Sequence, residues 1–176
     1  MMEAMGMHAL LAVGQGSIHP PCLVTIKYNG AGAAPYTAYV GKGITFDSGG
    51  ISIKPSDNMG EMKDDMAGAG AVLGALRAIA ALKIPCNVMG IIACAENMPS
   101  GSAQRPGDVV KAANGKTIEV ISTDAEGRMV LADAVWYACK QGAAKVVDIA
   151  TLTGGVIVAL GTETAGVVGN DDVLIR

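Results

Sequence analysis

Short apolar runs alternate with longer amphipathic segments along this chain. Most of these runs are continuously apolar, as expected for strands buried inside a sheet, and one alternates polar and apolar residues, as a half-buried strand does. Each is short enough for a strand and is bounded by polar or turn-forming residues. The predicted strands cover residues 22–28, the run through 39 and 40, and residues 87–95, 116–123 and 145–150.

Two longer segments have the period of an α-helix. In the first, apolar residues recur in steps of three and four, which defines one helix face. Pro85 closes this helix, and Gly142 ends the second one, EGRMVLADAVWYACKQG, where a left-handed cap is expected. Thr-Gly-Gly after the last predicted strand opens a further short helix. The face of the first helix consists of Met62, Met66, Ala69, Leu73, Leu76 and Ala80.

Strands that alternate with helices predict an α/β fold with a mixed, largely parallel central sheet flanked by helices on both faces. We see no repeat, linker or low-complexity tract, so residues 1–176 are read as part of a single domain. The chain stops at VVGNDDVLIR, just after a segment that reads as a strand, with no closing helix. We therefore expect a truncated domain with an uncovered sheet edge, which on its own would associate and be a poor enzyme.

Composition and charge narrow the possible functions. Hydrophobic residues make up 51% of the chain and charged residues 16%, which is typical of a globular protein with a large core. The net charge of −3 gives no basic surface for nucleic acid or an anionic membrane. No apolar run approaches the roughly 18 residues that cross a bilayer, and the N-terminus has no secretory signal. This charge pattern favours a peptide or a small molecule as the substrate.

The four cysteines are scattered, with no CxxC pair, and each falls in an apolar stretch. We interpret them as reduced core residues, which makes a cytosolic location the default.

Acidic and basic residues gather in three short stretches at strand ends or helix starts, where open α/β sheets bind their ligands. Two carboxylates separated by a single residue, together with carboxylates from other segments of the chain, can bridge two divalent cations roughly 3.5–4 Å apart. A set of oxygen ligands without histidine or cysteine favours Mg²⁺, Mn²⁺ or, less selectively, Zn²⁺. The three stretches contribute Lys42, Asp47 and Lys54, then Asp64 and Asp65 in the first turn of the long helix, then Asp124, Glu126 and Arg128.

Each of these residues also has an ordinary structural interpretation. Asp64 and Asp65 could complement a helix N-terminus, Asp124 could be an N-cap, and the lysines could lie on the surface. These interpretations weaken when the groups are taken together, because lone charges beside buried strands are unfavourable.

Other motifs are less convincing. DSGG resembles a serine-protease loop, but only His8 and His19 could serve as bases, and the α/β pattern does not suit that fold. NGKT lacks the leading glycine of a phosphate loop, since Val110 stands there. GAGAVLG, from Gly68 to Gly74, lies inside a helix, so its glycines are better explained by close helix–sheet packing.

The stretches VGKGITFDSGGISIKP, MKDDMAGA, NMPSGSAQRPGDV, TDAEGR and DIATLTG occur in that order. Together they resemble the leucyl aminopeptidase family, also called cytosol aminopeptidases or peptidase family M17. The resemblance runs from about Leu10 to Gly169, nearly the whole chain, and TDAEGR is close to diagnostic alone. It implies a zinc-peptidase-like catalytic domain without the family's N-terminal domain and without the C-terminal end of the catalytic domain.

The resemblance implies two divalent metal ions per subunit, Mn²⁺ or Zn²⁺, with Mg²⁺ or Co²⁺ as alternatives. Asp47 and Glu126 would bridge both ions, Asp65 and Lys42 would complete the tighter site, and Asp124 the more exchangeable one. Lys42 can be a ligand only as the neutral amine, so the adjacent cations would have to depress its pKa.

The resemblance also implies the release of N-terminal residues, preferably leucine-like, from peptides. Lys54 would stabilise the developing oxyanion, and Arg128 would hold a bicarbonate ion that relays a proton. Substrate contacts would come from Met62, which lines the pocket for the first residue, and from Thr151, Leu152 and Gly154.

The expected assembly is a cytoplasmic homohexamer, without membrane or nucleic-acid partners. This chain departs from the family in having Ser122 where Asn is common. The alternative function is a non-catalytic module that keeps only assembly contacts or a DNA-binding, regulatory role, which the complete ligand set and the net charge of −3 argue against.

Overall fold

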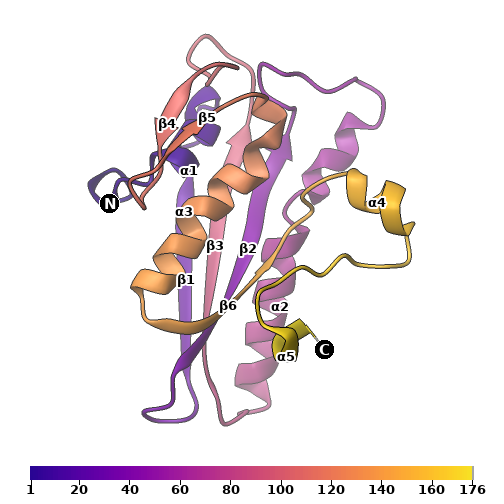
Figure 1. The fold of residues 1–176 in the computed structure, drawn as a ribbon. Coiled ribbons are helices and arrows are strands. Elements are labelled where there is room, and N and C mark those ends of the chain that lie inside the picture. The colour runs from indigo at the N-terminus through magenta and orange to yellow at the C-terminus, as the bar shows by residue number, and fades with distance from the viewer. Residues whose placement is uncertain (176) are drawn as a thin grey trace.

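A four-stranded sheet forms the centre of the computed structural model, which describes residues 1–175. Its strands lie in the order β1 (Cys22–Asn29), β3 (Asn87–Asn97), β2 (Tyr36–Asp47) and β6 (Ala143–Ile149) (Figure 1). β1 runs antiparallel to β3, whereas β2 runs parallel to both β3 and β6. The prediction of a mixed, largely parallel sheet is therefore confirmed.

Helices cover both faces of this sheet, as predicted. α2 (Ala67–Ala81) packs on one face, and α1 (His8–Val13) and α3 (Glu126–Lys140) pack on the other (Figure 1). Neighbouring residues of β3 point to opposite faces, so that Ile91 joins the α3 side of the core and Ile92 the α2 side. Because both faces are buried, β3 is apolar at nearly every position.

Shorter elements connect these layers. The small antiparallel sheet of β4 and β5 lies beside α1, and α4 and α5 follow β6 (Figure 1). The elements are η1 (Glu3–Met5), η2 (Gly14–Gly16), η3 (Met59–Asp64), β4 (Val109–Lys111), β5 (Thr117–Glu119), η4 (Thr123–Ala125), α4 (Gly155–Leu160) and α5 (Asp172–Ile175).

The first long helix is shorter than its apolar period predicts. Residues 59–64 form the 3₁₀ helix η3, and α2 begins only at Ala67, so Asp64 and Asp65 are not in its first turn. It ends at Ala81, before Pro85, because Lys83 takes a left-handed backbone with φ of 50°. Its buried face also differs: Val72 is fully buried, while Leu73 is 46% exposed.

One predicted strand is shorter than expected, and another is absent from the part of the chain that the structure describes. The expected strand at 116–123 is reduced to β5. After Glu119 the backbone of Val120 forms hydrogen bonds with the turn at residues 107–108: its amide donates to the Asp108 carbonyl, and its carbonyl accepts from the Gly107 amide. Within residues 1–175 no strand follows β6, and the chain reaches α5 instead.

The prediction that the cysteines are core residues is confirmed only in part, because Cys86 and Cys94 pack against the core and the other two do not. All four are free thiols; Cys22 and Cys139 are exposed, and Cys86 and Cys94 are only partly buried. Cys22 lies in the edge strand β1, most of whose side chains face solvent, and Cys139 lies near the exposed end of α3. An apolar sequence neighbourhood therefore does not predict burial at a sheet edge or a helix end.

Gly68 lets α2 lie directly against the backbone of the sheet. A Cβ atom at this position would lie 2.0 Å from the Ile149 carbonyl oxygen and 3.0 Å from the Lys42 amide nitrogen. Gly74, in the same helix, has nothing within 4 Å of the corresponding point. Close helix–sheet packing thus explains Gly68 but not Gly74.

We expect Gly68→Ala to lower the free energy of unfolding by about 1–3 kcal/mol, because the new methyl group overlaps backbone atoms that cannot move aside. Gly74→Ala is the matched control and should instead raise it by up to about 1 kcal/mol through helix propensity. Urea unfolding followed by circular dichroism measures both. Equal effects of the two changes would contradict this packing argument.

Candidate metal centre

Buried charged side chains from three distant segments meet at the carboxyl end of the central strands. Lys42 and Asp47 come from β2, Asp65 follows η3, and Glu126 opens α3. Each is at most 6% exposed. One carboxylate oxygen from each of Asp47, Asp65 and Glu126 lies within 4.8 Å of the other two. The parallel strands end at this edge of the sheet, which is where an open α/β fold binds its ligands.

Lys42 is the buried cation of this group. Its Nζ lies 2.8 Å from Asp65 Oδ1, 2.8 Å from Glu126 Oε1, and donates a 2.8 Å hydrogen bond to the Thr151 carbonyl. Burial by itself lowers the pKa of Lys42, but attraction to Glu126 and Asp65 outweighs it, so the pKa is raised overall. Without a metal ion, Lys42 is therefore an ammonium that neutralises the carboxylates around it.

The pKa values of two of the carboxylates are raised despite this lysine. Burial raises the pKa of Asp65 and of Glu126, and the Lys42 ammonium offsets only part of that effect. The charge of Asp47 adds repulsion that raises both pKa values further. The group thus contains more negative charge than Lys42 can balance.

Lys54 links Asp47 to the more exposed Asp124. Its Nζ lies 3.1 Å from Asp47 Oδ2 and 2.7 Å from Asp124 Oδ1. Partial burial lowers the pKa of Lys54, but its hydrogen bonds to Asp124 and Asp47 raise it more, so the net direction is upward. Asp124 is therefore joined to the buried carboxylates through this lysine. It does not cap α3, whose N-cap Ala125 makes no side-chain cap bond.

Two carboxylate oxygens of the centre have no hydrogen-bond partner among residues 1–175. They are Asp65 Oδ2 and Glu126 Oε2, and both are fully buried. A buried oxygen without a partner is unfavourable by about 1–3 kcal/mol, and more when it is charged. A divalent cation would satisfy both atoms and the excess negative charge, and an oxygen-rich set suits Mn²⁺, Mg²⁺ or Zn²⁺. The residues present therefore fit a metal site.

Polar residues that the sequence did not single out position these ligands. Asn97, at the end of β3, donates 2.8 Å to Asp47 Oδ1 and 3.0 Å to the Thr123 carbonyl. The Thr123 hydroxyl donates 2.6 Å to the Gly49 carbonyl. Gly49 has a φ of 87°, the left-handed region that favours glycine. The sequence could have indicated Asn97 as a candidate site residue, because it is a polar residue at the end of a buried strand.

The expected substrate-binding residues lie at different distances from the centre. The Thr151 hydroxyl donates 2.7 Å to Asp65 Oδ1, and a Cβ added to Gly127, next to Glu126, would lie 3.0 Å from the Leu152 side chain. Gly154 lies further along as the exposed N-cap of α4.

The two remaining candidates come from different helical elements beside the ligands. Met62 is half-buried in η3, and Arg128 is exposed in the first turn of α3. No ion pair joins Arg128 to another side chain within the described part of the chain.

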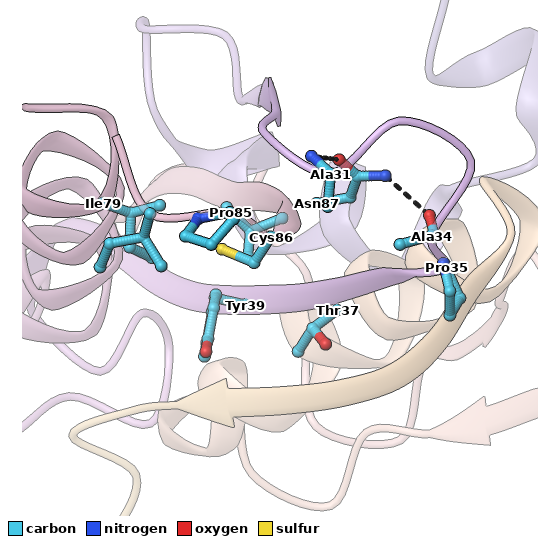
Figure 2. A pocket seen from close by; sticks show the side chains of 11 residues that line it. Ala31, Ala34, Pro35, Thr37, Tyr39, Ile79, Pro85, Cys86 and Asn87 are labelled. Atoms are coloured by element: carbon cyan, nitrogen blue, oxygen red, sulfur yellow. Dashed lines mark hydrogen bonds between the residues drawn. The ribbon is translucent and has the colours of Figure 1, made fainter. Parts of the chain in front are cut away.

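Two cavities occupy opposite ends of the sheet. The first, of about 300 Å³, is lined by Lys54, Met62 and Asp124 together with neighbouring residues of the 55–61 segment. The second, of about 520 Å³, lies at the amino ends of β2 and β3 (Figure 2). Its only amide side chain is that of Asn87, which accepts a hydrogen bond from the Ala31 amide and donates one to the Ala34 carbonyl. The residues that line this cavity include no charged group. Only the first cavity adjoins groups that could carry out hydrolysis.

Comparison with known proteins identifies the family. Residues 1–176 match the model for the catalytic domain of the cytosol aminopeptidase family. The chain is 56% identical over 177 aligned residues to a probable cytosol aminopeptidase of Azotobacter vinelandii. It is 54% identical to a cytosol aminopeptidase of Pseudomonas aeruginosa, and 56% identical to a probable one of Afipia carboxidovorans.

These alignments cover 98–99% of this chain but only 35–36% of the relatives, so the chain spans about a third of their length. Among residues 1–175, no helix is both long and apolar enough to cross a membrane. The family match runs along the whole chain. The chain belongs to the cytosol aminopeptidase family, and all of its residues match the model for the family's catalytic domain.

Proposed function

We propose that this chain forms the metal-binding core of an aminopeptidase that releases N-terminal residues, preferably leucine-like, from peptides. The observation that carries the proposal is the pair of buried carboxylate oxygens without partners, Asp65 Oδ2 and Glu126 Oε2, beside Asp47. Family membership supports the same reaction, because the relatives that match the whole chain are named as aminopeptidases.

Asp47, Asp65, Asp124, Glu126 and the amine of Lys42 would hold two divalent cations, Mn²⁺ or Zn²⁺. When bound, such cations supply a water of lowered pKa and polarise the scissile carbonyl. Lys42 must lose a proton before it can be a ligand, and its carboxylate partners hold that proton tightly. Metal binding at this centre therefore releases protons and strengthens as pH rises.

Lys54 is the residue best placed to stabilise the negative charge that develops on the substrate. It lies at the wall of the 300 Å³ cavity, between Asp47 and Asp124. Both of these carboxylates are proposed metal ligands. With cations bound, they would interact with the metals as well as with the Lys54 ammonium. The ammonium would then have N–H groups available to donate to the substrate oxygen. A preorganised donor of this kind is most effective in a site that excludes water.

The remaining roles complete the proposed site. Arg128 presents an exposed guanidinium two residues after Glu126, where its fork of donors suits a small planar anion such as bicarbonate, the proposed proton relay. Met62 gives the cavity an apolar surface for a leucine-like side chain. Thr151, Leu152 and Gly154 follow β6 along the same edge and are proposed to contact the substrate.

Assembly and location are also proposed by analogy with the family. The full-length protein would be a cytoplasmic homohexamer that acts on peptides.

The test uses a full-length family member in which this 176-residue segment replaces the corresponding residues. With Mn²⁺, it should hydrolyse Leu-p-nitroanilide at least ~100-fold faster than after dialysis against EDTA, because a Lewis-acid metal supplies several kcal/mol. N-acetyl-Leu-p-nitroanilide is the control, since an aminopeptidase needs a free amino group. Hydrolysis of the acetylated substrate at the same rate, or activity unaffected by EDTA, would contradict the proposal.

A further inference from the structure

Two cysteines face each other across the edge of the central sheet. β1 pairs antiparallel with β3, and Cys22 lies directly opposite Cys94 in that register. Directly opposed residues point to the same face, with Cα atoms about 4.5–5.5 Å apart. A disulfide needs a Cα separation of about 4.4–6.8 Å. The strand register therefore places the two α-carbons within the range that a disulfide can span.

The surroundings of the pair give the two thiols different roles. Cys22 is exposed, at the first residue of the edge strand β1, so an oxidant in solution reaches it directly. Cys94 is partly buried, and its Sγ lies 3.1 Å from the position of a Cβ on Gly43. Burial, followed by the neighbouring Cys22 thiol, raises the pKa of Cys94 to about 11. Cys94 therefore remains a protonated thiol at neutral pH and is itself a poor target for oxidants.

The end of the strand also allows the small movement that a bridge requires. Cβ atoms of directly opposed residues are about 4.5–5.5 Å apart, whereas a disulfide brings them to about 3.5–4.5 Å. Cys22 is the terminal residue of β1, and β1 has only β3 as a neighbour in the sheet. Cys22 itself is exposed and is not among the side chains that pack against the core, whereas the next residue, Leu23, is one of them.

We propose that Cys22 and Cys94 form a reversible disulfide when the protein meets a peroxide. Hydrogen peroxide transfers one oxygen to the Cys22 thiol, giving a sulfenic acid and one water. The Cys94 thiol then attacks the Cys22 sulfur, the S–S bond forms, and the sulfenic oxygen leaves with the Cys94 proton as a second water. Two thiols lose two electrons and two protons in total, and one peroxide becomes two waters.

The bridge would tie the edge strand to the strand that supports the metal centre. Cys94 lies three residues before Asn97, which bonds the Asp47 carboxylate. The oxidised pair would therefore fix β1 against the part of β3 that orients a proposed metal ligand. A dithiol reductant would return both residues to thiols.

The other two cysteines provide an internal control. Cys86 precedes β3 and lines the 520 Å³ cavity, and Cys139 lies near the end of α3. Neither is paired with another cysteine in the strand registers of the described residues. A peroxide that oxidised cysteines only according to exposure would therefore modify Cys139 as readily as Cys22.

The experiment treats the folded 176-residue chain with equimolar hydrogen peroxide and measures intact mass and thiol content. We expect a loss of about 2 Da and of two of the four thiols, both reversed by dithiothreitol, with peptide mapping showing a Cys22–Cys94 bridge. The double variant Cys86→Ser/Cys139→Ser should react in the same way. Cys22→Ser should not, and because Cys22 is exposed this variant is expected to fold, which circular dichroism checks.

Several outcomes would overturn the proposal. These are a mass gain on Cys22 with Cys94 still a free thiol, a bridge that involves Cys86 or Cys139, and a disulfide-linked dimer on a non-reducing gel. Bridge formation at the same rate in urea would also overturn it, since the folded register would then not be what brings the two thiols together.

Discussion

Replacing Lys54 by alanine should lower kcat by about 10²–10³-fold while the protein keeps its bound metal. The expectation rests on the position of the ammonium, which touches Asp47 and Asp124 and lines the cavity beside Met62. Removal of one preorganised donor to a developing oxyanion typically has an effect of this size. Alanine leaves all the proposed metal ligands in place, so metal content should not change.

The experiment is done in the full-length family member that carries this segment, with kcat from Leu-p-nitroanilide hydrolysis and metal content from elemental analysis. Lys63→Ala is the matched control, because Lys63 is an exposed lysine in the neighbouring η3. It should leave both quantities unchanged. A parallel loss of metal and activity in Lys54→Ala would mean that Lys54 holds the site together and does not act on the substrate.

The layers of the fold could be predicted because they follow from local patterns. Continuous apolar runs such as that at residues 87–95 occur where a strand is buried on both faces, and β3 is such a strand. The left-handed backbone at Gly142, with φ of 83°, was also predictable, since glycine is the residue that adopts it readily at a helix end.

The boundaries of α2 could not be predicted from such patterns. Apolar spacing alone does not distinguish a 3₁₀ turn from an α-helix, and Met62 and Met66 extended the period into η3. The buried face is decided by the sheet: Val72 meets β3, while Leu73 points outward. The predicted buried face was therefore wrong by one position, because contacts with the sheet, and not the local sequence, determine which side of the helix is buried.

The candidate site also has features that could be predicted from the sequence and features that could not. That charged residues at strand ends would converge could be predicted, because the ends of parallel strands lie at one edge of the sheet. The pairing of Lys42 with Asp65 and Glu126, and of Lys54 with Asp124, could not, because each contact joins segments far apart in the sequence. The same holds for the support that Asn97 gives to Asp47 across two strands.

The change Glu126→Gln should weaken Mn²⁺ binding by at least ~100-fold. Glutamine has nearly the same shape, and its amide oxygen can still accept the Lys42 hydrogen bond. It cannot supply the second, anionic oxygen, Oε2, which is buried without a partner. Loss of a residue that merely orients a ligand already weakens metal binding by about 10–100-fold, so loss of a ligand should exceed that range.

Thermal unfolding of the 176-residue chain separates this role from a purely structural one. Glutamine keeps the hydrogen bond to Lys42, which retains its ion pair with Asp65, so the metal-free variant should unfold near the wild-type temperature. At a Mn²⁺ concentration ~100 times the wild-type Kd, binding adds about 2.7 kcal/mol to the wild type and only about 0.4 kcal/mol to a variant that binds 100-fold more weakly. Glu119→Gln, the same change at an exposed position of β5, should behave as wild type. If Glu126→Gln instead destabilised the metal-free protein and left the Mn²⁺-dependent shift intact, the buried carboxylates would be a structural ion-pair network and not a metal centre.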